Sequence, residues 1–157
     1  MAPVAYIEQI RRLYPNDPPY QWTVNLTSPW APMLKPVRDC RIALISSGGI
    51  YHKSQEPFNP IKNDLSFREI PNTADLADLR ISHYSKNARD VRDLNTIFPL
   101  DRFRELETGR IIGELALLAF TFMGRIFMRT RLQKEMAPHL IERLREMAVD
   151  AAFLVPV

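Results

Sequence analysis

Apolar runs and helical stripes follow one another from residue 41 onward. Arg41–Ser46 is almost continuously apolar, which is typical of a strand buried on both faces of a parallel sheet. Residues 65–70 alternate between apolar and polar side chains and predict a second strand, and residues 79–83 predict a third. Ala151–Val155 is a further short apolar run. We expect it to form a buried strand that completes half of a βαβ unit with the helix before it.

Two segments show helical spacing. Residues 99–106 begin with a proline in the first turn, and Gly109 is a plausible end for that helix. Residues 130–147 predict the clearest helix, in which Pro138 should cause a kink or a local break. Its apolar stripe comprises Leu132, Met136, Leu140, Ile141, Leu144 and Met147.

Two shorter stretches predict a helical turn and a further strand. Residues 73–75 could cap a short helical turn between the second and third strands. Residues 117–122 fit a fourth strand, and a helix that continues from Ile111 is the competing interpretation.

The first 39 residues differ from the rest. Residues 4–13 have an apolar spacing of three and predict a short amphipathic helix, which the proline-rich residues 15–19 end. The segment that follows, up to Pro36, carries Trp22 and Trp30 and is expected to be an extended arm. It either packs over the domain surface or contacts a partner, since tryptophans on extended segments make good interface anchors.

These elements predict an α/β fold with a mostly parallel sheet and flanking helices, flavodoxin-like or Rossmann-like in style. We expect residues 1–39 to form the helix and arm, and residues 40–157 to form the α/β domain, incomplete at its carboxyl end. The length of 157 residues fits one such domain, and the hydrophobic content of 46% is ordinary for a globular chain.

Composition argues for a cytoplasmic protein that binds neither membranes nor nucleic acid. No apolar run is long enough to cross a bilayer, and the first residues lack the pattern of a signal peptide. The net charge of +3 is small, and basic residues are interleaved with acidic ones. One basic cluster, formed by Arg125, Arg129, Arg131 and Lys134, could bind an anion, but a solvated helix start is the better interpretation.

Metal and disulfide chemistry have little support in the sequence. Cys40 is the only cysteine, so it is expected to be a small buried hydrophobe rather than part of a disulfide or a metal cluster. A polar run around Asp90, Asp93, Asn95 and Asp101 could hold Mg²⁺, although a surface loop explains it better. We therefore predict no metal site.

Histidines supply the candidate proton-transfer groups. His52 follows the Gly48-Gly49 turn at the carboxyl end of a predicted strand, and His83 ends another, so the two could meet at one site. For either histidine alone, hydrogen bonding to backbone groups is the better interpretation. His139 lies beside the apolar stripe of the long helix and is expected to be structural. Motifs for nucleotide binding, metal hydrolysis and serine esterase chemistry are absent.

Several blocks between Cys40 and Val157 resemble the selenoprotein B family of glycine, sarcosine, betaine and D-proline reductases. The resemblance rests on the order and spacing of these blocks over about three quarters of the chain. They are residues 42–51 (IALISSGGIY), 64–71 (DLSFREIP), 81–84 (ISHY), 93–102 (DLNTIFPLDR), 122–124 (FMG) and 149–157 (VDAAFLVPV).

The resemblance implies reductive cleavage of a C–N bond in a small amino acid or amine-type substrate, with a thiol or selenol as the electron donor. It implies His52 and His83 as catalytic candidates for proton transfer. It also implies a complex with a partner subunit that carries a carbonyl (pyruvoyl) cofactor, or a homo-oligomer, and no cofactor bound by this chain. The candidate substrate-binding residues are Gly48, Gly49, Asn95, Asp101 and Arg102.

In proteins that resemble this chain, the final strand leads into a U-x-x-C or C-x-x-C motif, whose first position is selenocysteine or cysteine. We expect that redox residue to lie beyond Val157, behind a UGA codon read as a stop. A genuinely short chain that pairs with a thiol-bearing partner is the competing explanation. A non-catalytic binding or assembly subunit that uses the Trp22/Trp30 arm is the alternative function.

Overall fold

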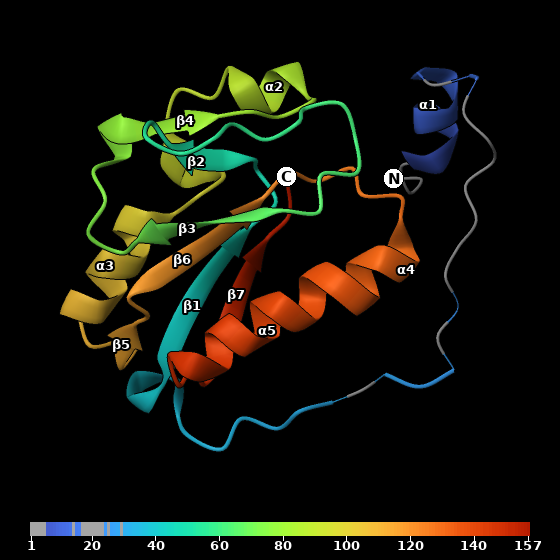
Figure 1. Ribbon diagram of the computed structural model, residues 1–157. Coiled ribbons are helices and arrows are strands. Elements are labelled where there is room, and N and C mark those ends of the chain that lie inside the picture. The colour runs from blue at the N-terminus through green and yellow to red at the C-terminus, as the bar shows by residue number, and fades with distance from the viewer. Residues whose placement is uncertain (1–5, 14, 17–23, 25, 29) are drawn as a thin grey trace, which may run out of the picture. The chain divides into compact units, whose positions relative to one another are not determined.

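The computed structural model describes residues 6–13, 15–16, 24, 26–28 and 30–157 (Figure 1). The chain divides into two units, Met1–Pro32 and Met33–Val157. The first contains the helix α1, Tyr6–Leu13, with Glu8 in its first turn and Arg11 and Arg12 in its last, as the helix dipole favours. This helix falls within the predicted residues 4–13, of which residues 4 and 5 lie outside the described part, as does Trp22.

A five-stranded sheet forms the centre of the second unit (Figure 1). It consists of β1 (Arg41–Ser46), β3 (Phe67–Pro71), β5 (Glu114–Leu115), β6 (Leu118–Phe122) and β7 (Ala151–Val155). On one side, β1 pairs with β5 at its start and with β6 at its end, and on the other side with β7, all in parallel. Only β3 runs antiparallel, along β6. The prediction of an α/β fold with a mostly parallel sheet is confirmed.

The central strand is buried as its sequence predicts. Ala43 and Leu44 are fully buried, and β1 has the predicted bounds. Residues 117–122 form the strand β6 rather than a helix. Cys40 is 2% exposed, as expected for a small buried hydrophobe.

A separate two-stranded ribbon lies beside the main sheet. The strands β2 (Ile50–His52) and β4 (Leu79–Ile81) pair antiparallel, with Ile50 opposite Ile81 and His52 opposite Leu79. The sequence gives little sign of β2, because only three residues separate the glycine turn from the following loop. The predicted third strand ends at Ile81, two residues before His83.

Helices cover both faces of the main sheet (Figure 1). The helix α3, Leu100–Thr108, buries Leu100 and Phe103 and is capped by Gly109, as predicted. The helical turn Leu76–Asp78 is capped by Asp75, whose side chain accepts a hydrogen bond from the Ala77 amide. Shorter helical segments are α2 (Lys86–Arg89) and the 3₁₀ turns Val37–Asp39 and Leu94–Thr96.

The long helix near the carboxyl end continues through Pro138, and a π-helical turn lies where the sequence predicted a kink or a local break. The helix comprises α4 (Arg129–Arg131), the π-helical turn (Leu132–Met136) and α5 (Ala137–Glu146). Proline lacks an amide hydrogen and its ring crowds the carbonyl four residues earlier. The wider π turn just before Pro138 absorbs this strain, so the helix continues.

Two expectations about this region are wrong. His139 is exposed. The apolar stripe that was expected beside it is not buried as a whole, because Met136 is its one buried member. The strand β7 has the predicted bounds, but it is the edge strand and not a buried one: Phe153 is 51% exposed and Leu154 66% exposed. No further strand covers it among the described residues, so its apolar side chains remain at the surface.

Candidate functional site

The carboxyl ends of β1, β6 and β7 meet at one edge of the sheet. The Gly49 amide donates to the Phe122 carbonyl (2.9 Å), and the Gly124 amide donates to the Ser47 carbonyl (3.0 Å). The Val157 amide donates to Ser47 Oγ (2.9 Å). Ligands of α/β proteins bind at this kind of edge. Ser47 therefore holds the segments that follow β6 and β7 beside the turn that follows β1.

The two glycines after β1 are needed to build this turn. Gly49 has a φ of +64°, and a Cβ there would lie 2.2 Å from the Ser82 carbonyl oxygen. At Gly48 a Cβ would lie 3.1 Å from Ser46 Oγ. The Gly48 amide donates to that same hydroxyl (3.1 Å). Since both amides already donate within the protein, the clear role of the glycines is to shape the edge.

His83 lies at this edge and is fully buried. The Ser85 amide donates to its Nδ1 (3.2 Å), so in the neutral ring the proton is on Nε2. Nε2 is buried and has no hydrogen-bond partner among the described residues. Burial, aided by the positive charge of Arg89, lowers the pKa of His83 below its usual value. The ring is thus a neutral hydrogen-bond donor with no acceptor, which is unusual for a buried group.

Gly124 leaves space beside this donor. A Cβ built on Gly124 would lie 3.7 Å from His83 Nε2 and 3.5 Å from the Ser47 carbonyl oxygen, at ordinary contact distances. Because Gly124 has no side chain, an open space lies between the imidazole and Ser47. Sequence reasoning did not single out Ser47 or Gly124 as site residues. The only signal for them was that both lie in blocks that carried the resemblance.

Cationic groups surround the outer side of His83. Its ring packs on the Tyr84 ring at 4.5 Å between centroids, and the Arg125 guanidinium lies 5.0 Å from the centroid of Tyr84. Arg89 donates to the carbonyl of His83 (2.7 Å) and to that of Tyr84 (3.2 Å). These charges favour anionic species near the edge.

His52 lies elsewhere. It ends β2 opposite Leu79, whereas His83 follows the other end of β4, so the two histidines stand at opposite ends of the ribbon. His52 Nδ1 bonds with Ser54 Oγ (2.6 Å), and its Nε2 is 3.8 Å from Asp78. The structure therefore does not bring His52 and His83 to one site.

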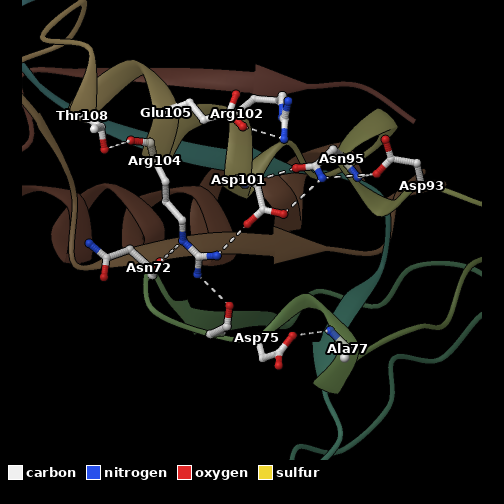
Figure 2. Close-up of polar contacts among 11 residues, drawn as sticks. Asn72, Asp75, Ala77, Asp93, Asn95, Asp101, Arg102, Arg104, Glu105 and Thr108 are labelled. Atoms are coloured by element: carbon white, nitrogen blue, oxygen red, sulfur yellow. Dashed lines mark hydrogen bonds and ion pairs between the residues drawn. The ribbon is translucent and has the colours of Figure 1, made fainter.

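Asn95 and Asp101 are joined in a network at the start of α3 (Figure 2). The Asp101 amide donates to Asn95 Oδ1 (3.1 Å), and Asn95 Nδ2 donates to Asp101 Oδ2 (3.3 Å). Arg104 donates to Asp101 Oδ1 (2.7 Å) and to the carbonyl of Asn72 (2.6 Å). The loop that contains Asn95 reaches the edge at Ile97, whose carbonyl accepts a hydrogen bond from Ser46 Oγ (2.6 Å).

Arg102 does not join this network. It forms an ion pair with Glu105 (2.7 Å) one turn along α3, and both side chains are more than half exposed (Figure 2). Asn95 and Asp101 thus stabilise a loop behind the edge, whereas Arg102 points to solvent.

A groove lies away from this edge. It has a volume of about 740 Å³ and lies between residues 65–67 and the helical segment of α4 and α5. Arg131 and Lys134 of the predicted basic cluster line it, but Arg131 is paired with Glu135 (2.7 Å). Within the part of the chain that the structure describes, no group of acidic, histidine or cysteine side chains is arranged to hold a metal ion. Nor does any helix there have the length and apolar character needed to cross a membrane.

The fold and this edge define a class: an α/β domain whose candidate site lies at the carboxyl ends of parallel strands. Among curated proteins, the chain is similar to the D-proline reductase subunit gamma of Acetoanaerobium sticklandii, with 34% identity over 134 residues. The match covers 83% of this chain and 55% of that subunit, so the chain spans about half the length of its relative. No family model and no solved structure matches the chain.

Proposed function

We propose that this chain is a component of a D-proline reductase-type enzyme, in which the carboxyl edge of its sheet forms part of the reductive site. Two findings support this proposal together. The similarity to D-proline reductase subunit gamma covers most of the chain. The Val157 amide donates to Ser47, and Ser47 and the buried donor of His83 both border the open space at Gly124.

The reaction is a two-electron cleavage of a C–N bond in a small cyclic or secondary amine such as D-proline. The bond breaks, the carbon gains one hydrogen and the nitrogen gains another. Two thiols, or a selenol and a thiol, supply these two electrons and two protons and become a disulfide or a selenenylsulfide. We place the redox residue in polypeptide that follows Val157, at the edge where Ser47 holds the chain.

Within this proposal His83 acts as a hydrogen-bond donor rather than as a general acid. Its lowered pKa keeps the imidazole neutral, and a neutral imidazole gives up its remaining proton only with difficulty. Its Nε2–H is well suited to stabilise a nearby thiolate, selenolate or substrate carboxylate. The Asn95–Asp101 network holds the loop behind this edge in place, and substrate contact by Gly48, Gly49 and Arg102, like a catalytic role for His52, stays a prediction.

In this proposal the carbonyl cofactor belongs to the partner subunit. A reductase of this kind works as a complex, so the chain requires that partner for turnover.

The test begins with the codons that follow Val157. If a cysteine codon appears in frame within a few positions after the stop, the extended chain is expressed with Cys in place of the stop. It is then assayed with the partner subunit for dithiol-dependent reduction of D-proline. Turnover that is lost in His83→Leu and largely kept in His83→Gln supports the proposal, because glutamine retains an N–H donor; His52→Gln is the matched control. Absence of the cysteine codon, or an extended chain without a reactive thiol, would contradict it.

A non-catalytic assembly subunit is the second candidate, and the exposed segment before β1 favours it. Trp30 is 87% exposed and Leu34 is 92% exposed. Large apolar side chains at the surface mark contacts with partners. If the extended chain shows no turnover but forms a stable complex that Trp30→Ala disrupts, the assembly role is the correct one.

A further inference from the structure

Arg125 places a positive charge beside the candidate site. Its guanidinium lies 5.0 Å from the centroid of the Tyr84 ring, which packs on the His83 ring at 4.5 Å between centroids. Arg89, the other cation next to His83, already donates to two backbone carbonyls. No carboxylate among the described residues forms an ion pair with Arg125. The charge of Arg125 is therefore available to bind an anion at this edge of the sheet.

The backbone of Arg125 is held in an unfavourable conformation. Its φ of +60° lies in the left-handed region, which is strained for a residue with a side chain. In the described part of the chain, Arg110 and Ala148 share this conformation just after α3 and α5, where helices commonly end in it. Asn63 also shares it, but asparagine tolerates it. Arg125 follows the strand β6 instead, so the contacts around it must impose its conformation.

Asn63 supplies these contacts. Its amide donates to the Arg125 carbonyl (3.2 Å). Its Oδ1 accepts hydrogen bonds from the amides of Phe127 (2.7 Å) and Met128 (3.1 Å). The three bonds hold the loop after β6 on both sides of Ile126. The loop therefore presents Arg125 in a defined position, directly after Gly124.

The open space at Gly124 leads to the buried donor of His83. Because Nε2 is buried, an acceptor can reach it only through a gap in its surroundings. A Cβ on Gly124 would lie 3.7 Å from Nε2, and Gly124 itself is partly exposed, so this space is such a gap. An anion that enters beside Gly124 meets the Nε2–H on its inner side and the residue Arg125 on its outer side.

The donors and acceptors around this space suit the carboxylate of an amino acid. A guanidinium binds a planar carboxylate through two parallel hydrogen bonds. The lowered pKa of His83 keeps its imidazole neutral, so Nε2 donates its hydrogen without adding charge. The Ser47 carbonyl oxygen lies 3.5 Å from the same Cβ position. It repels a ligand that has only acceptor atoms, such as phosphate, but it can accept a hydrogen bond from an ammonium group.

We infer that Arg125 and the Nε2–H of His83 together bind the carboxylate of the substrate. The identity of that substrate, a cyclic amino acid such as D-proline, rests on the proposed function, whereas the assignment of the two residues rests on the geometry. The inference adds a requirement to the proposed function: a cyclic amine without a carboxylate, such as pyrrolidine, should be neither bound nor reduced.

The first experiment titrates the chain with D-proline and follows the imidazole signals of His83 by NMR. We expect saturable shifts with a dissociation constant of about 1–10 mM, because the ligand has few atoms. Arg125→Gln should raise this constant at least about tenfold, since the charged partner is lost. Arg110→Gln is the matched control and should leave it unchanged. Arg110 is also exposed and left-handed, but it precedes β5, which pairs with the start of β1.

Three results of this titration would overturn the inference. The first is an absence of saturable shifts with D-proline. The second is equal affinity in the wild type and Arg125→Gln. The third is binding of pyrrolidine or inorganic phosphate as tight as that of D-proline, because the site would then not recognise an amino-acid carboxylate.

The second experiment closes the space with Gly124→Ala. The new methyl group would meet its nearest neighbours at 3.5 Å or more, so the variant should fold with an unchanged midpoint in urea. It should nevertheless bind D-proline at least about tenfold more weakly, because the methyl group fills the approach to Nε2. A folded variant that binds as tightly as the wild type would contradict the assignment of His83.

The binding site and the proposed reductase function fail in different ways. In the complex of the extended chain with the partner subunit, Arg125→Gln should raise KM for D-proline and leave kcat nearly unchanged. If no extended chain turns over but D-proline still binds through Arg125, the reductase function is wrong and the carboxylate site stands. If turnover is normal and Arg125→Gln changes neither KM nor binding, the carboxylate site is wrong and the reductase function stands.

Discussion

His83 should make the stability of the fold depend on pH in the neutral range. The imidazole is fully buried, and burial lowers the pKa of His83 below its usual value of 6.5. In the unfolded chain the same side chain titrates near 6.5. As the pH falls below that value, the unfolded state gains a proton that the folded state does not, so the free energy of unfolding decreases. Stability is therefore complete above the unfolded pKa and is lost on acidification.

The magnitude follows from one proton. The slope cannot exceed about 1.4 kcal/mol per pH unit for a single group. For one such group, the loss between pH 7.5 and pH 5.5 is therefore at most about 1.4 kcal/mol in total. The carboxyl groups whose pKa the fold lowers, Asp64, Asp78, Glu135 and Asp150, lose their contribution only in more acidic solution, below about pH 5.

Urea denaturation of the wild type and His83→Gln at several pH values from 5.5 to 7.5 measures this effect. At pH 7.5 the variant should be less stable by about 1 kcal/mol, because the bond from the Ser85 amide is lost. The difference should shrink or reverse at pH 5.5. His139→Gln, at an exposed position, should keep the dependence due to His83. Parallel curves for the wild type and His83→Gln across this range would refute the reasoning.

Three further substitutions test the fold, each by urea denaturation. Gly49→Ala should destabilise the protein by more than about 3 kcal/mol, because the backbone is left-handed and the new methyl group would lie 2.2 Å from the Ser82 carbonyl; a loss below 1 kcal/mol would contradict this. Glu69→Gln should cost only about 0–1 kcal/mol, since its ion pair with Arg143 is about one third exposed. Pro138→Ala should stabilise the helix by up to about 3 kcal/mol and convert the π turn to regular α-helix, which amide hydrogen exchange would detect.

The sequence predicts the parts of the fold that local pattern controls. Arg41–Ser46 and Ala151–Val155 were bounded correctly, because continuous apolar runs between turn residues are strong strand signals. Gly109 was correctly predicted to end a helix, and residues 73–75 to cap a helical turn, where Asp75 is the cap, since capping depends on the residue itself and its nearest neighbours.

Burial of β7 was predicted wrongly for a related reason. An apolar run is compatible with a strand covered on both sides, but the covering depends on which strands are neighbours, and that is a property of the whole sheet. Phe153 and Leu154 are exposed because β7 has β1 on one side and no described strand on the other. The π turn before Pro138 was missed for the opposite reason: the sequence shows the proline, but not how the backbone relieves its strain.

The candidate site shows the same division. The sequence pointed to the turn after β1 and to His83, because a strand end is visible locally. It could not show that His52 lies at the far end of the ribbon, since that depends on the register between β2 and β4. Nor could it show Ser47 as the contact between three strand ends, because its partners lie 77 and 110 residues away along the chain.

The buried, unpaired N–H of His83 lowers the stability of the fold. An unpaired buried N–H costs roughly 1–3 kcal/mol, which a purely structural residue at this position would avoid. Packing does not require glycine at position 124. Alanine would fit there at ordinary contact distances and would fill the space beside Nε2. A donor without an acceptor and a space without a side chain therefore occur together beside Ser47, which holds the end of β7. That combination is expected where an acceptor group arrives during function, and it supports the proposal that the reductive site lies at this edge of the sheet.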